Sequence, residues 1–172
     1  MNDFKGVMTG DILYVSGKGI VSSVIKFFTG GPVSHVGVIY DTRLVFETDG
    51  AWMKAQLYPL TKYNAAKVYV RRLKSMTGAQ KGCVQELCEK YNNTPYSYWD
   101  IILNAVGIVL PKKKRKKFVS VLGTKAFAKC DEMTRRIIYE ATGYPPFENF
   151  EDSTPSDMFI DGEYSGDFQV II

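Results

Sequence analysis

The clearest fold signal in this sequence is a pair of β-type segments that flank a short polar turn. Val33 to Tyr40 and Leu44 to Thr48 are rich in β-branched and aromatic residues, and only Asp41, Thr42 and Arg43 lie between them. This arrangement predicts an antiparallel β-hairpin. Three other short segments have strand-like patterns: Asp11 to Val15, Lys67 to Leu73 and Phe168 to Ile172. The sequence therefore predicts a small, mainly antiparallel sheet.

Apolar residues recur with a helical spacing in four longer segments, which are residues 20–28, 77–91, 100–110 and 130–142. After Gly143-Tyr144-Pro145-Pro146 the chain is expected to be loop-like until the last strand. With 172 residues, 45% of them hydrophobic, the chain has the size and composition of one globular domain. We therefore expect residues 1–172 to form a single α+β domain, with the helices packed against the sheet.

The positive charge of the chain is concentrated in one place. The net charge of +4 arises from 22 basic and 18 acidic residues. Six of the basic residues are consecutive, and without them 16 basic residues face 18 acidic ones; they are Lys112, Lys113, Lys114, Arg115, Lys116 and Lys117. A general nucleic-acid-binding surface is therefore not expected.

The basic run directly follows an apolar segment, Trp99 to Leu110. An apolar body with an aromatic end and a cationic flank is typical of elements that contact an anionic membrane surface. The same run also resembles a nuclear localisation signal or a nucleic-acid patch, and a solvated loop is the simplest alternative. We expect residues 112–117 to contact an anionic membrane surface.

The expected location is the cytoplasm. Trp99 to Leu110 is the longest nearly uninterrupted apolar segment and is too short to span a bilayer, which requires about 20 apolar residues. The first six residues, Met1 to Gly6, show neither the basic region nor the apolar core of a secretory signal. The three cysteines are few and odd in number, so reduced thiols are expected.

His35 is the only histidine, and it lies within the first strand of the predicted hairpin. Gly37 is two residues further on and points to the same face, so a second group could approach the imidazole there. An imidazole is the usual general base of cysteine and serine hydrolases. The alternative is a histidine that serves only in packing or at the surface.

Cys130 begins a predicted helix, where the positive end of the helix dipole stabilises a thiolate. Cys83 and Cys88 lie within another predicted helix and are expected to be packing residues. The four cysteine and histidine residues lack the spacing of a zinc site, so no metal is expected. A buried structural thiol remains the alternative for Cys130.

Glu47 could orient His35 if the hairpin has the appropriate register. A two-residue turn would pair His35 with Thr48 and direct Glu47 away from the imidazole. A three-residue turn would pair Gly37 with Glu47 and bring Glu47 to the face of His35, diagonal to it. Both turn lengths are common, so the residues alone leave the two registers open, and an exposed strand carboxylate is the alternative for Glu47.

Seven short motifs occur along the chain, and they are Gly10–Leu13, Ile25–Thr29, Ser34–Ile39, Phe46-Glu47, Pro95–Tyr98, Lys129–Glu132 and Thr154–Asp157. Their order and spacing resemble the permuted branch of the NlpC/P60 superfamily. This branch includes the YiiX/YaeF-like proteins, poxviral relatives and the lecithin retinol acyltransferase-like enzymes. Ser97 and Asp131 differ from the family pattern, which has an acid and a serine at these positions.

The resemblance implies a circularly permuted papain-like fold in which the histidine precedes the cysteine. It assigns Cys130 as the nucleophile, His35 as the general base and Glu47 as the residue that orients the imidazole. Tyr96 and Tyr98 are weaker candidates for contact with the oxyanion or the substrate. The resemblance requires no metal or organic cofactor.

Two functions follow from these residues. The first is a cysteine hydrolase or acyltransferase that acts on an amide, thioester or ester bond of a small-molecule, lipid, lipid-linked or peptide substrate. The second is a non-catalytic module that binds a membrane or a nucleic acid through residues 112–117. A Cys130 thiol that reacts with iodoacetamide faster than Cys83 and Cys88 would distinguish the first from the second.

Overall fold

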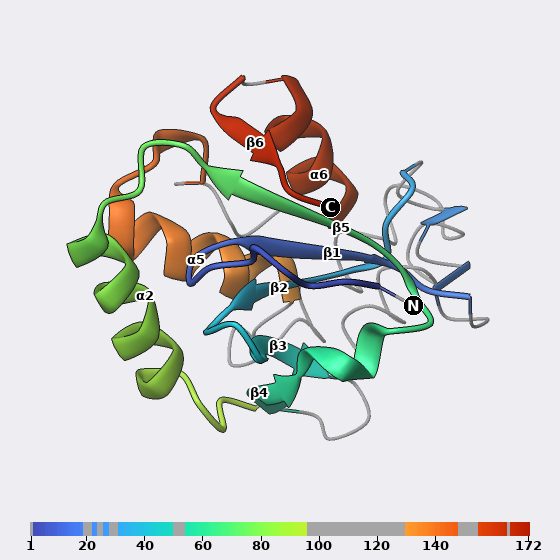
Figure 1. Ribbon diagram of the computed structural model, residues 1–172, viewed down its shortest axis with the longest axis horizontal. Coiled ribbons are helices and arrows are strands. Elements are labelled where there is room, and N and C mark those ends of the chain that lie inside the picture. Colours follow the sequence, from blue (N-terminus) through green and yellow to red (C-terminus); the bar gives the residue numbers. More distant parts are fainter. Residues whose placement is uncertain are drawn as a thin grey trace, which may run out of the picture.

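The computed structural model describes residues 2–18, 22–23, 26–27, 31–49, 54–95, 130–147, 155–164 and 166–172. Six strands form one sheet in the order β4-β3-β2-β1-β5-β6, and each neighbouring pair is antiparallel. The strands are β1 (Ile12–Ser16), β2 (His35–Ile39), β3 (Leu44–Asp49), β4 (Lys54–Pro59), β5 (Lys67–Leu73) and β6 (Phe168–Val170) (Figure 1). The predicted antiparallel sheet is confirmed.

Asp41 determines the register of the β2–β3 hairpin. Its Oδ1 atom accepts hydrogen bonds from the backbone N–H groups of Arg43 and Leu44, both at 2.7 Å. Such Asx contacts stabilise a turn through the side chain. The turn spans three residues, and Val38 pairs with Phe46. Of the two registers left open by the sequence, the structure therefore has the one with the longer turn.

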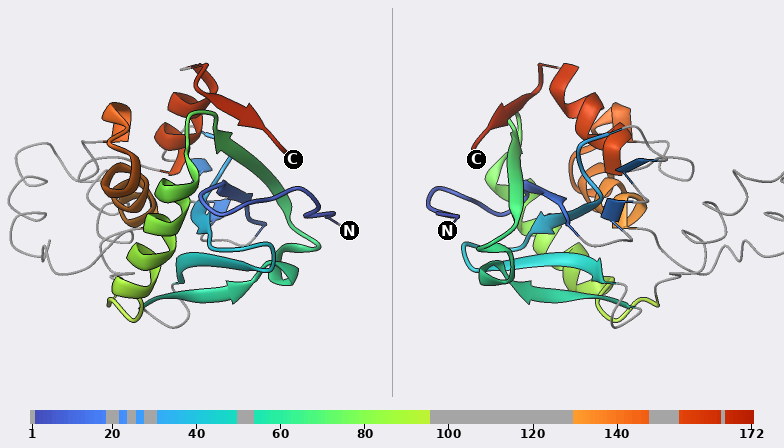
Figure 2. Two further views of the ribbon diagram at one scale, coloured as in Figure 1. Left: turned by 60° about the vertical axis from the view of Figure 1, so that its left-hand side comes forward. Right: turned by 90° about the vertical axis from the view of Figure 1, so that its right-hand side faces the viewer.

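The helices lie mainly on one side of the sheet. They are α2 (Gly78–Lys90), α5 (Cys130–Thr142) and α6 (Pro155–Tyr164), together with the short 3₁₀ helices η1 (Leu60–Tyr63) and η2 (Pro145–Phe147). Figure 2 shows α2 and α5 side by side on one face, with the N-terminal segment and η1 towards the other. The sheet and its helices give the α+β architecture expected from the sequence.

Each face of the sheet carries its own hydrophobic core, because successive strand residues point to opposite faces. The core under α2 and α5 includes Ile12, Val38, Phe46 and Ile137. The core on the opposite face is covered by η1 and the N-terminal segment; it includes Leu13, Val15, Ile39, Val45, Leu60 and Tyr63. His35 and Glu47 alternate along their strands with Val36 and Phe46, which belong to the core under α2 and α5. The side chains of His35 and Glu47 therefore lie on the opposite face of the sheet, the face that carries η1.

One strand and one α-helix among the described elements were not expected from the sequence. Strand β4 lies in a segment with no strand prediction, and α6 lies where the chain was expected to be loop-like, so the latter expectation is wrong. The backbone of α6 accepts hydrogen bonds at Met158 and Phe159 from the side chains of Tyr14 and Arg71. These contacts with distant strands stabilise α6, and a local sequence pattern does not reveal them.

The remaining helix predictions have different outcomes. The predicted helices 77–91 and 130–142 are present as α2 and α5, and Thr77 caps α2 through a capping box. Within the predicted helix 20–28, residues 22–23 and 26–27 are helical. The predicted helix 100–110 lies outside the described residues. Among the described residues, no helix has the length and apolar character needed to cross a membrane.

Candidate active site

His35 and Glu47 form a hydrogen-bonded pair on adjacent strands. His35 is the first residue of β2, its side chain is 23% exposed, and its Nε2 atom lies 3.0 Å from Oε2 of Glu47. The absence of a side chain at Gly37 allows β3 to approach this closely. A Cβ atom at Gly37 would lie 2.9 Å from the Phe46 carbonyl oxygen and 3.1 Å from Cβ of Glu47. Gly37 therefore provides the space that the sequence indicated.

The Glu47 carboxylate is completely buried and accepts hydrogen bonds at both oxygens. Lys62 Nζ donates to Oε1 at 2.6 Å, and the Tyr63 hydroxyl donates to Oε2, the oxygen that also contacts His35. Burial by itself would raise the pKa of Glu47, but the charges and hydrogen bonds of His35 and Lys62 lower it to about 2. Glu47 is therefore ionised over the physiological pH range.

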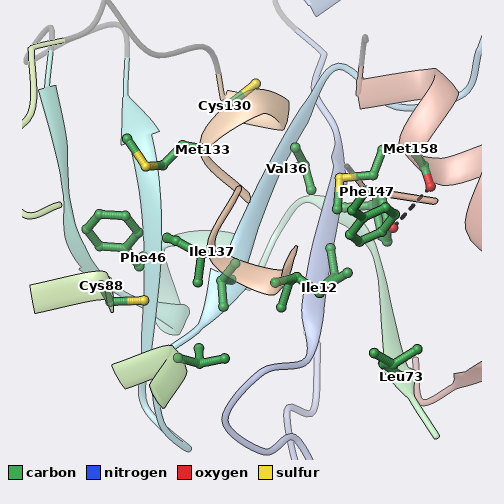
Figure 3. Close-up of a cluster of buried hydrophobic side chains, with 14 of the residues drawn as sticks. Ile12, Val36, Phe46, Leu73, Cys88, Cys130, Met133, Ile137, Phe147 and Met158 are labelled. Carbon is green, nitrogen blue, oxygen red and sulfur yellow. Dashed lines mark hydrogen bonds between the residues drawn. The ribbon is translucent and has the colours of Figure 1, made fainter. Parts of the chain in front are cut away.

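Cys130 lies at the start of α5, which packs against β2 and β3. The residue is 5% exposed, and its thiol lies near enough to the His35 imidazole to contribute to the raised pKa of that imidazole. Because Nε2 of His35 contacts Glu47, Nδ1 is the ring nitrogen that remains for Cys130. Figure 3 shows the Cys130 sulfur at the first turn of α5, directed away from the core around Ile137.

The environment of His35 favours its protonated form. Burial alone would lower the pKa of the imidazole, but the Glu47 charge and the hydrogen bonds to Cys130 and Glu47 raise it from 6.5 to about 10. The imidazolium is therefore the dominant species at neutral pH. A cation of this kind beside a thiol is the arrangement that activates cysteine nucleophiles.

The other two cysteines lie in α2, away from this pair. Cys88 is buried, and burial together with Glu89 raises the pKa of its thiol well above the usual range. Cys83 is half-buried and packs against the same core. Neither thiol lies at a helix terminus, so both have the packing environment expected from the sequence.

The described residues do not form a metal centre. No group of three His, Cys, Asp or Glu side chains among them could hold a metal ion. Glu47 has the Lys62 ammonium on one oxygen and the Tyr63 hydroxyl on the other, and a cation would have to displace both. The donors at this site fit a buried ion-pair network, not metal coordination.

Lys62 and Tyr63 were not identified from the sequence. Both lie in η1, directly after the edge strand β4, and neither belongs to a motif. Their contact with Glu47 arises because β4 pairs with β3 and places Gln56 opposite Glu47. The chain then turns back at Pro59. No local pattern could have revealed this contact.

Two further groups of candidate residues lie outside the described residues. These are Tyr96 and Tyr98, the candidates for contact with the oxyanion or the substrate, and the basic run of residues 112–117. Their expected roles stay predictions. The described part of the site therefore consists of Cys130, His35 and Glu47, with Lys62 and Tyr63 around the carboxylate.

No protein-family model matches the chain. A sequence relative is the probable lipoprotein peptidase YaeF of Escherichia coli (strain K12), with 27% identity over 93 residues, or 54% of this chain. The matched region spans only 34% of YaeF, about a third of its length. A structural relative is the metalloprotein YiiX of Escherichia coli O157:H7, with a TM-score of 0.64, 17% identity and 96% coverage of both chains.

The chain is similar to YaeF in sequence and to YiiX in fold. The fold match covers nearly the whole of both chains, and the predicted circularly permuted papain-like fold is thereby confirmed. The predicted resemblance to the YiiX/YaeF-like branch is confirmed by the two relatives together. The links to the poxviral proteins and to the lecithin retinol acyltransferase-like enzymes stay predictions.

Proposed function

We propose that this YiiX/YaeF-like protein is a papain-like cysteine hydrolase with a Cys130-His35-Glu47 triad. The observation that carries the proposal is a continuous set of contacts. Cys130 helps to raise the pKa of the His35 imidazole, and Nε2 of this imidazole lies 3.0 Å from the buried Glu47 carboxylate. A nucleophile, a base and a group that orients the base therefore lie next to one another in this spatial order, as nucleophilic catalysis requires.

Each residue has a defined chemical task in this proposal. The Cys130 sulfur attacks the carbonyl carbon of the substrate, and backbone N–H groups at the start of α5 stabilise the developing oxyanion. His35 donates its proton to the leaving amine, alkoxide or thiolate as the carbonyl–heteroatom bond breaks. The resulting thioester is hydrolysed by water, which transfers a proton to His35. Glu47 keeps the imidazole oriented during both steps.

The substrate is best sought among peptides and lipoproteins. YaeF is described as a probable lipoprotein peptidase, and this chain is similar to it over 93 residues. An amide bond in a peptide or lipid-linked peptide is therefore the first substrate class to assay. Esters and thioesters are the second class, because the same thiol chemistry cleaves them, and acyl transfer would result if another nucleophile replaced water.

Thiol alkylation tests the proposal without knowledge of the substrate. The native protein is treated with a limiting amount of iodoacetamide between pH 5 and 8, and the label at each cysteine is quantified by peptide mass spectrometry. We expect Cys130 to react at least about tenfold faster than Cys83 and Cys88, and to retain this reactivity below pH 7, because the His35 imidazolium supports the thiolate.

Two variants make this experiment specific. Cys130→Ala should abolish the fast phase of labelling, whereas Cys83→Ala should leave it unchanged, since Cys83 lies within α2 and away from His35. If all three cysteines are labelled slowly and at similar rates, the protein lacks an activated thiol and the hydrolase proposal is wrong.

A further inference from the structure

The Glu47 carboxylate is held by two consecutive residues of η1. Lys62 Nζ lies 2.6 Å from Oε1, and the Tyr63 hydroxyl donates to Oε2. Lys62 is itself placed by aromatic rings: its Nζ atom lies 4.0 Å from the centre of the Tyr58 ring and 5.4 Å from that of Tyr63. Cation–π contacts of this length attract the ammonium group to the ring faces and thereby favour its position beside Glu47.

These contacts leave the carboxylate with one orientation towards the imidazole. Oε1 is bound to Lys62, so Oε2 is the oxygen that faces Nε2 of His35. A partial rotation of the carboxylate plane would weaken the contacts with both Lys62 and Tyr63. The carboxylate is completely buried, so water does not compensate for such a loss.

We propose that Lys62 and Tyr63 are positioning residues that fix the Glu47 carboxylate and partly neutralise its charge, so that His35 can release its proton. This inference rests on the proposed function, because proton release matters only if His35 acts as an acid towards a leaving group. Among the described residues, the groups that face His35 are Glu47 from β3 and Cys130 from α5. The groups that face Glu47 from η1 are Lys62 and Tyr63.

The direction of the effect follows from the charges. Glu47 stabilises the imidazolium, and an imidazolium that is too stable cannot donate its proton. Lys62 is a positive charge on the same carboxylate, so it competes with the imidazolium for the negative charge of Glu47. Tyr63 withdraws electron density from the oxygen that contacts His35. Removal of either residue should therefore make His35 harder to deprotonate.

Proton NMR of the native full chain measures this effect directly. His35 is the only histidine, so a single Hε1 resonance reports its titration without assignment. In Lys62→Met we expect the titration midpoint to move to higher pH by about one unit. Tyr63→Phe should move the midpoint in the same direction by less, and Lys62→Arg should keep it close to that of the unmodified protein.

Lys67→Met is the matched control for the lysine replacement. Lys67 is exposed on β5 and lies 5.3 Å from the centre of the Tyr69 ring, an aromatic contact without Glu47. Its replacement should leave the His35 midpoint unchanged. A role of Lys62 in packing alone would lower the melting temperature of Lys62→Met without moving the midpoint.

Unchanged midpoints in folded Lys62→Met and Tyr63→Phe would overturn the inference. If Lys62→Met does not fold, Tyr63→Phe decides, because it removes one hydroxyl and preserves the ring. The iodoacetamide experiment is separate: an unreactive Cys130 would refute the hydrolase proposal, whereas the midpoint of His35 would still show whether Lys62 and Tyr63 control the pair. The two failures are therefore distinguishable.

Discussion

Glu47 governs the protonation state of His35. Burial disfavours the imidazolium, and the pKa of His35 is raised because the charge and hydrogen bond of Glu47, together with the effect of Cys130, outweigh burial. The carboxylate can do so because its own pKa is held at about 2 by His35 and Lys62. In the proposed hydrolase, the reactivity of Cys130 therefore depends on Glu47, a side chain that need not touch a substrate.

Glu47→Gln tests this dependence with little change in shape. Without the charge, burial should prevail, and the His35 titration midpoint should move from about 10 towards or below the ordinary value of 6.5. The imidazolium beside Cys130 would then be lost at pH 7, so alkylation of Cys130 should slow by about tenfold or more. Proton NMR and labelling rates provide the two measurements. Glu89→Gln, on the exposed side of α2, is the control and should change neither.

The sequence predicts some of these residues and misses others for physical reasons. His35 is conspicuous because it is the only histidine, and Cys130 because it begins a helix. Glu47 could be placed only once the turn length was known, and the side chain of Asp41 determines that length. Lys62 approaches Glu47 through the pairing of β4 with β3, a tertiary contact that leaves no local pattern.

At the scale of elements, the site depends on the close approach of β2 and β3. Gly37 lies against the backbone of Phe46 and the Cβ atom of Glu47. The two strands form the hairpin that the sequence predicted. Strand β4 was missed because it is an edge strand with a half-buried pattern and ends in Pro59, features that weaken a strand signal. Sequence patterns thus predict the central strands and the β6 edge of this sheet, but not its β4 edge.

Gly37→Ala should disturb both the sheet and the pair. The added Cβ would lie 2.9 Å from the Phe46 carbonyl oxygen and 2.9 Å from Cγ2 of Val45, so β3 must move away from β2. We expect a loss of about 1–3 kcal/mol in the free energy of unfolding. The His35 midpoint should also fall, because the distance to Glu47 increases.

Gly82→Ala is the matched glycine control. Gly82 lies within α2, and a Cβ atom there would meet nothing within 4 Å. Alanine favours a helix interior over glycine, so this variant should gain about 0.5–1 kcal/mol and leave the His35 midpoint unchanged. Urea denaturation and NMR titration measure the two quantities. Equal stability of Gly37→Ala and the unmodified protein would contradict the proposed close approach.

At the scale of the whole molecule, the fold brings together segments that are far apart in the sequence. Cys130 follows His35 by 95 positions, and α5 reaches β2 because helix and sheet share one hydrophobic core. The cost of burying the His35–Glu47 ion pair is offset only while both groups are charged. The stability of the whole protein should therefore report the protonation of this pair.

The pH dependence of stability has a defined direction for each group. The pKa of His35 lies above its ordinary 6.5, so its protonation stabilises the fold fully below pH 6.5, and this contribution is lost as the pH rises through about 10. The pKa of Glu47 lies below its ordinary 4.5, so its ionisation stabilises the fold above pH 4.5, and this contribution is lost as the pH falls through about 2. The pair should stabilise the protein most between pH 4.5 and 6.5.

A comparison with the double variant His35→Gln/Glu47→Gln isolates this contribution, because all other titratable groups remain in both proteins. The difference in the free energy of unfolding, measured by urea denaturation from pH 3 to 9, should be greatest at pH 4.5–6.5 and decrease above it by at most about 1.4 kcal/mol per pH unit.

The exposed Lys90–Glu140 ion pair, at 3.6 Å, is the control. Its removal by Lys90→Met/Glu140→Gln should change the stability little at any pH in this range, since exposed pairs are screened by water. A difference between the unmodified protein and the double variant that does not vary with pH would mean that His35 and Glu47 do not form an ion pair in the folded protein.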